Sequence, residues 1–140
     1  MTVPHVPILS PDQLPISLGT HLDGRSKTVV SDLINPHGFV VFRGYGVRSD
    51  QEFHDFIECF DLPNFTYAES FSNAVRRNRT PRVFTANEAP PEIEIFLHHE
   101  MAQTLVFPGQ LFFFCEQAPT EGGATPIGRS DLALVTLEKA

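Results

Sequence analysis

The sequence predicts a mainly β domain with flanking helices, an α+β arrangement, from three observations. Several short runs combine β-branched and aromatic residues, and residues 111–116 form the strongest of them. Two longer segments near the N-terminus carry apolar residues at helical spacing. With 140 residues and a hydrophobic content of 41%, the chain is long enough for one modest domain with its own core.

The N-terminal segment, residues 1–24, is rich in proline and polar side chains, so we expect an irregular arm lying over the fold. The spacing of apolar residues then predicts a helix over residues 26–35, which Asn35, Pro36 and Gly38 end. A short buried strand is predicted over residues 38–44. Ser49 and Glu52 form a capping box that starts a second helix, and this helix ends near Leu62.

The pattern is weaker in the rest of the chain. Residues 64–82 are expected to form a long loop, residues 82–85 a strand and residues 86–91 a turn. Further strands are predicted at 105–107, 111–116 and 125–127, the last after a turn at Gly122 and Gly123. Ser130 and Asp131 then cap a helix over residues 132–138.

Composition excludes several function classes. The net charge is −7 and no stripe combines basic and aromatic residues, which argues against nucleic acid as a partner. No apolar run approaches the roughly 20 residues needed to cross a membrane. Cys59 and Cys115 lie far apart and outside any CxxC, as expected in a reducing compartment. We therefore expect a soluble, cytoplasmic protein.

The candidate metal ligands are His98 and Glu100. In an extended segment, residues two apart point the same way, so their imidazole and carboxylate can meet at one point while His99 faces away. Imidazole and carboxylate are two of the ligands in the two-His-one-carboxylate sites that hold non-haem Fe(II). His-X-Glu alone is a weak signal, and its sequence context decides its weight.

That context is a series of motifs in a fixed order. They are RVFTANE at 82–88, LHHEMAQ at 97–103, LFFFCE at 111–116 and GGATPI at 122–127. Together with residues 38–44, they resemble the TauD/TfdA (taurine dioxygenase) superfamily, in its clavaminate synthase-like branch. The resemblance covers residues 26–135 and makes residues 25–140 similar to the N-terminal half of the family's domain.

The resemblance implies an incomplete double-stranded β-helix, a jelly-roll or cupin-like barrel, and an Fe(II)- and 2-oxoglutarate-dependent oxygenase of the hydroxylase type. It places iron ligation on His98 and Glu100 and 2-oxoglutarate binding on Thr125. Asn87 falls in the loop that faces the active site in related proteins. Arg76 and Arg77, in a basic cluster, are candidates for binding an amino-acid-like or carboxylated small substrate.

The chain also departs from the family pattern. The second His ligand and the Arg that binds 2-oxoglutarate are absent after Glu100, where Arg129 lies too early to match. Three interpretations stay open: a truncated oxygenase, a chain completed by a second polypeptide or by self-association through an open sheet edge, and a degenerate binding domain. A non-catalytic cupin-like binding module is the alternative function.

Overall fold

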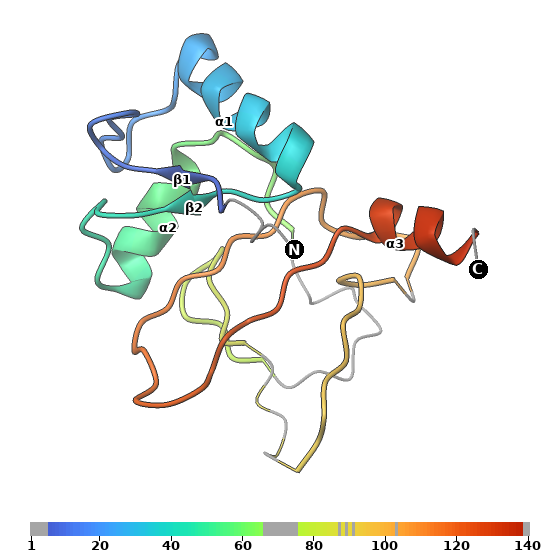
Figure 1. Cartoon of the computed structure of the whole chain (residues 1–140). Helices are drawn as coiled ribbons and strands as arrows, with labels where there is room; N and C mark the ends of the chain where they lie inside the picture. Colours follow the sequence, from blue (N-terminus) through green and yellow to red (C-terminus); the bar gives the residue numbers. More distant parts are fainter. Residues whose placement is uncertain are drawn as a thin grey trace.

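The computed structural model describes residues 6–65, 76–86, 88, 90, 92–102 and 104–138. Within them the elements run in the order β1 (Ile8–Leu9), α1 (Gly24–His37), β2 (Val41–Phe42), α2 (Asp50–Glu58) and α3 (Ser130–Leu137). The first four gather at one end of the molecule, and long irregular loops lead from them to α3 (Figure 1).

The N-terminal segment takes part in the core. β1 pairs in parallel with β2, with Ile8 opposite Val41, and the Val41 amide donates to the Pro7 carbonyl at 2.8 Å. Leu9 and Leu14 are 3% and 4% exposed. The first described residues thus contribute a strand and buried side chains besides the predicted irregular stretch. The strand predicted at 38–44 is confirmed only over β2.

α1 is confirmed and is longer than predicted, because it continues through Asn35 and Pro36 to His37. Its two ends have clear chemical causes. The Asp23 carboxylate accepts a hydrogen bond from the Ser26 amide at 2.7 Å, and this bond lowers the pKa of Asp23. At the other end Gly38 has a φ of 80° and donates its amide to the Ile34 carbonyl. A left-handed residue here favours glycine, because it has no Cβ to clash.

α2 is also confirmed, with a shorter span than predicted. The Ser49 hydroxyl accepts from the Glu52 amide at 3.2 Å, as the capping box requires. The Glu52 carboxylate accepts from the Arg48 amide at 2.8 Å, one residue before the expected donor. The helix ends at Glu58 rather than near Leu62.

The core is built around aromatic rings from β2 and α2. Phe42 lies 5.2 Å from Phe56 and 5.7 Å from Phe60, measured between ring centroids, in edge-on geometry. Tyr45 joins them 5.6 Å from Phe56, and its hydroxyl donates to the Leu14 carbonyl at 2.8 Å. Burial raises the pKa of Tyr45, since it disfavours the phenolate. These contacts fix α2 relative to the small sheet.

The predicted mainly β architecture is not confirmed. In the described part of the chain helix exceeds strand, and the segments predicted as strands at 105–107, 111–116 and 125–127 are irregular. The segment at 82–85 contributes only a single bridge, between Asn78 and Phe84. A segment with high strand propensity forms a strand only when its backbone pairs with a neighbouring strand. No described segment pairs in this way with residues 105–127.

α3 forms as predicted but with a different cap. Its N-cap residue is Arg129, so Ser130 and Asp131 lie inside the helix rather than before it. No side chain of α3 is buried, and Leu137 is 73% exposed. Among the helices of the described residues, none has the length and apolar character to cross a membrane.

Candidate functional site

An open cleft of about 1240 Å³ lies between α2 and the irregular loops. Phe53 and Ile57 of α2 form part of its wall, and Phe112 and Phe114 contribute from the segment opposite. Phe112 also lies 5.0 Å from Phe60, measured between ring centroids. The lining of the cleft is therefore in contact with the aromatic core of the fold. It collects most of the polar residues that the sequence marked as site candidates.

His98 lines this cleft and is exposed. Its Nδ1 lies 2.7 Å from the carbonyl oxygen of Phe96. A carbonyl only accepts, so we assign the proton to Nδ1. In that tautomer Nε2 carries a lone pair, which is the form in which a histidine binds a metal.

The chain turns immediately after His98. Residues 100–102 form a turn in which Met101 has a φ of 60° and is 3% exposed. His99 lies just before this turn and is also among the residues that line the cleft. That His99 faces away from His98 stays a prediction.

Glu100 lies in the cleft and is paired with Arg76. The Arg76 guanidinium approaches the carboxylate with Nη2 3.0 Å from Oε1, and the two side chains are 18% and 15% exposed. This contact joins residues 24 positions apart in the sequence. Arg76, predicted to bind substrate, is thus in contact with the predicted metal ligand.

The other predicted residues lie in different places. Thr125 is exposed and lines the cleft with His98 and Glu100. Arg77 does not line the cleft; its side chain is 74% exposed and pairs with Glu88 at 2.9 Å. Asn87 lies outside the described residues. Of the predicted residues, His98, Glu100, Thr125 and Arg76 therefore line the same cleft, and Arg76 and Glu100 are in contact.

Sequence reasoning did not identify Arg79 and Arg82 as cleft residues, although it noted the basic cluster that contains them. Both line the cleft, and each is paired with a carboxylate on α2. Arg79 Nε lies 2.7 Å from Asp50, and this hydrogen bond raises the pKa of Arg79. Arg82 pairs with Glu58. The available signal was the set of acidic residues at 50, 52, 55 and 58 on α2, which can pair with the basic cluster.

His98 and Glu100 are of the residue types that a non-haem iron site uses, and both line one cleft. The tautomer assigned to His98 leaves Nε2 for a metal, and Glu100 supplies a carboxylate. Within the part of the chain that the structure describes, no group of three His, Cys, Asp or Glu side chains could hold a metal ion. The remaining protein ligand of such a site is not among the described residues.

Comparisons with known proteins give consistent results. A family model described as taurine catabolism dioxygenase TauD, TfdA family matches residues 6–138. A clavaminate synthase-like protein of Arabidopsis thaliana is 42% identical over 114 residues, which are 81% of this chain and 34% of the relative. The dapdiamide synthesis protein DdaC of Enterobacter agglomerans is 27% identical over 137 residues, 97% of this chain and 40% of the relative.

The chain spans between a third and two fifths of the length of these curated relatives. The aligned part includes nearly all of this chain in the second case. No solved structure gives a significant match.

Proposed function

Because the chain belongs to the taurine catabolism dioxygenase TauD, TfdA family, we propose that it forms the N-terminal part of an Fe(II)- and 2-oxoglutarate-dependent dioxygenase. Members of this family depend on Fe(II) and 2-oxoglutarate and have a cupin-like fold. The observation that carries the proposal is that His98, Glu100 and Thr125 line one cleft. The substrate is a small organic molecule, and its oxidation is of the hydroxylase type.

In this proposal each residue has a distinct task. His98 and Glu100 would hold Fe(II), His98 through Nε2 because Nδ1 is engaged with the Phe96 carbonyl. Thr125, which lines the same cleft, would supply a hydroxyl to 2-oxoglutarate. Bound iron would supply the activation of dioxygen coupled to 2-oxoglutarate decarboxylation. Phe53 and Phe112 would offer apolar surface in this cleft to a small organic substrate.

We propose the double-stranded β-helix only for a longer protein that contains this region. The segments predicted as strands carry side chains with high strand propensity, but they lack partner strands among the described residues. The curated relatives extend well beyond the matched region. We propose that in such relatives the further length supplies the partner strands and the third protein ligand.

Fe(II)-dependent binding of 2-oxoglutarate tests this function. We expect calorimetry under anaerobic conditions to show that Fe(II) strengthens 2-oxoglutarate binding to the chain, and that the Glu100→Ala variant loses this effect. The His21→Ala variant, altered at an exposed histidine outside the cleft, is the matched control. An equal Fe(II) effect in the wild-type and Glu100→Ala proteins would contradict the iron-ligand assignment.

A non-catalytic cupin-like binding module is the second candidate, favoured by the absence of a three-residue metal cluster among the described side chains. The same assay separates the two functions. A binding module would take up 2-oxoglutarate equally well with and without Fe(II), as measured by calorimetry. Small-molecule binding is common to both candidates.

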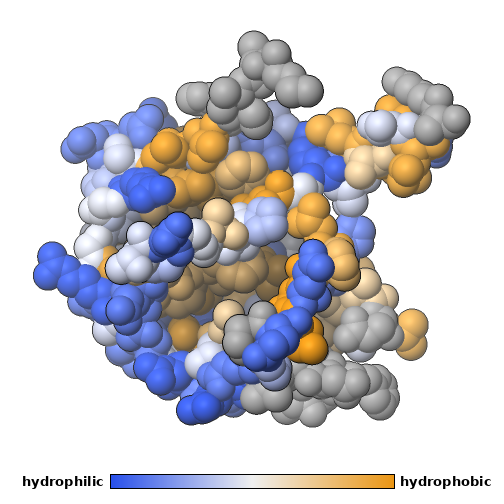
Figure 2. Space-filling view, turned by 60° about the horizontal axis from the view of Figure 1, so that its bottom comes forward, coloured by the Kyte–Doolittle hydropathy of each residue, from blue (hydrophilic) through white to orange (hydrophobic). Residues whose placement is uncertain are grey.

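Self-association is proposed as well, through apolar side chains rather than through a formed sheet edge. Hydrophobic residues are spread over one face of the molecule (Figure 2), and Leu105 and Phe113 are 99% and 74% exposed. α3 adds Leu134 and Leu137. We expect sedimentation velocity to show oligomers, and the Leu134→Glu and Leu137→Glu double variant to shift them toward monomer. A monomeric wild-type chain would contradict this expectation.

A further inference from the structure

The geometry of the Arg76–Glu100 ion pair allows it to orient the Glu100 carboxylate as well as to stabilise the fold. Arg76 Nη2 lies 3.0 Å from Glu100 Oε1, both side chains are less than a fifth exposed, and both line the cleft. Hydrogen bonds between ionised partners are stronger and more directional than neutral ones. We propose that Arg76 is a positioning residue that orients the Glu100 carboxylate for binding a divalent cation. This inference rests on the proposed function.

Arg76 comes directly before a backbone-paired loop. The Thr85 amide donates to the Arg77 carbonyl at 3.0 Å, and the Arg77 amide donates to the Thr85 hydroxyl at 3.0 Å. Further along, the Arg79 amide donates to the Val83 carbonyl at 2.8 Å. These bonds close residues 77–85 into a hairpin-like unit. The position of Arg76 is therefore set by the unit that follows it.

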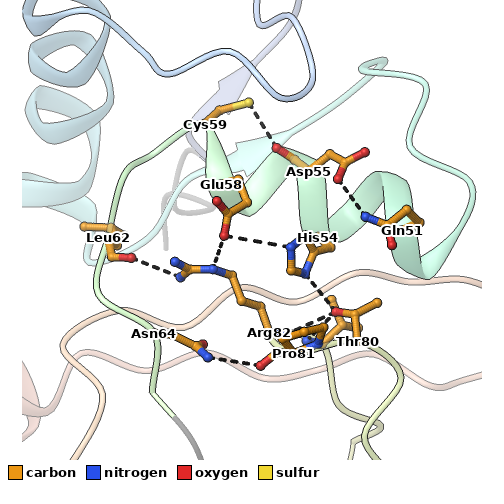
Figure 3. Close-up of polar contacts among 11 residues, drawn as sticks. Gln51, His54, Asp55, Glu58, Cys59, Leu62, Asn64, Thr80, Pro81 and Arg82 are labelled. Carbon is orange, nitrogen blue, oxygen red and sulfur yellow. Dashed lines mark hydrogen bonds and ion pairs between the residues drawn. The ribbon is translucent and has the colours of Figure 1, made fainter.

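That unit is fastened to α2 and to the segment after it by side chains (Figure 3). His54 Nδ1 lies 2.9 Å from the Thr80 hydroxyl, and Arg82 pairs with Glu58. Arg82 Nη1 also donates to the Leu62 carbonyl at 3.0 Å. Since α2 is packed into the aromatic core, these contacts connect the loop to the buried core of the fold. Through these contacts, Arg76 holds Glu100 in place relative to the core.

The contact with Arg76 matters for the orientation of the Glu100 carboxylate, because the Glu100 backbone lies in a turn. The segment around it, residues 92–99, is irregular and exposed, so no regular element holds the carboxylate. A carboxylate can accept a bond from an arginine and bind a cation at the same time, because its two oxygens have about four lone-pair sites. Hydrogen bonds to ligating carboxylates contribute to metal affinity in characterised sites. The Arg76 contact fits this role.

Co(II) titration of the full 140-residue chain tests the inference, with visible absorbance and calorimetry as readouts. We expect Arg76→Met to weaken Co(II) binding by about 10- to 100-fold. Arg76→Lys keeps the charge but loses the planar fork, and we expect an intermediate loss. Arg77→Met is the matched control, because Arg77 is the adjacent arginine, pairs with Glu88 and lies outside the cleft lining. We expect it to bind Co(II) like the wild type.

The outcomes separate the two proposals. Wild-type protein that binds no Co(II) would contradict the ligand assignment of the proposed function and also this inference. Binding that is equal in wild type and Arg76→Met would overturn the inference and leave the ligand assignment standing. A loss of the same size in Arg77→Met would show that the effect is not specific to Arg76 and would also overturn the inference.

Thermal unfolding without metal, followed by circular dichroism, identifies variants that merely fail to fold. If Arg76→Met does not fold, the Arg76→Lys titration decides. A folded Arg76→Lys protein with wild-type Co(II) affinity would then contradict the positioning role, because only the geometry of the contact has changed.

Discussion

Replacing Phe56 with alanine is expected to lower the free energy of unfolding by about 3–5 kcal/mol. Phe56 is 5% exposed, and its ring contacts those of Phe42, Tyr45 and Phe60 at centroid distances of 5.2, 5.6 and 5.5 Å. Removing the ring loses its burial and leaves a cavity between β2 and α2. Because small domains are stable by only about 5–15 kcal/mol, a large part of the stability would be lost.

Urea denaturation followed by circular dichroism measures this change. Phe113→Ala is the matched control, because Phe113 is 74% exposed, and we expect a change within about 0.5 kcal/mol. A Phe56→Ala protein as stable as the Phe113→Ala protein would show that the rings of β2 and α2 are not the core of this fold.

Replacing His98 with alanine is expected to weaken binding of Fe(II), measured anaerobically by calorimetry, by more than about 100-fold. The loss exceeds that expected for a residue that only supports a ligand, about 10- to 100-fold, because a ligand itself is removed. The assigned tautomer leaves Nε2 for the metal, and the alanine side chain offers no donor.

His21→Ala is the control for the histidine substitution, since His21 is exposed and lies outside the cleft lining. His99→Ala adds a sharper comparison, because His99 lines the same cleft one residue away. A large loss in His99→Ala with none in His98→Ala would move the ligand assignment by one residue and contradict the account.

The helices could be predicted because their signals are local. The Ser49 cap and the periodic apolar residues of α2 lie within a few positions of each other, and the structure confirms both. Gly38 was likewise predicted to end the first helix, and it is the C-cap residue of α1. Cap and period act through neighbours in sequence, so they need no knowledge of the rest of the fold.

The strands and the details of the site could not be predicted in the same way. Residues 111–116 have strong strand propensity, but a strand forms only against a partner, and the described residues provide none. His98 and Glu100 could be proposed from a local motif. The contact of Glu100 with Arg76 joins residues 24 positions apart and depends on how the loop at 77–85 is fastened to α2.

The most direct test of the central claim is residue-specific NMR during titration with Mn(II), a paramagnetic divalent cation that broadens nearby signals. The account predicts that the amide signals of His98, Glu100 and Thr125 broaden first, while that of Val30, buried on α1, is unchanged. Broadening centred on exposed acidic residues such as Glu121, with His98 and Glu100 unaffected, would contradict the assignment of these two residues as the metal ligands.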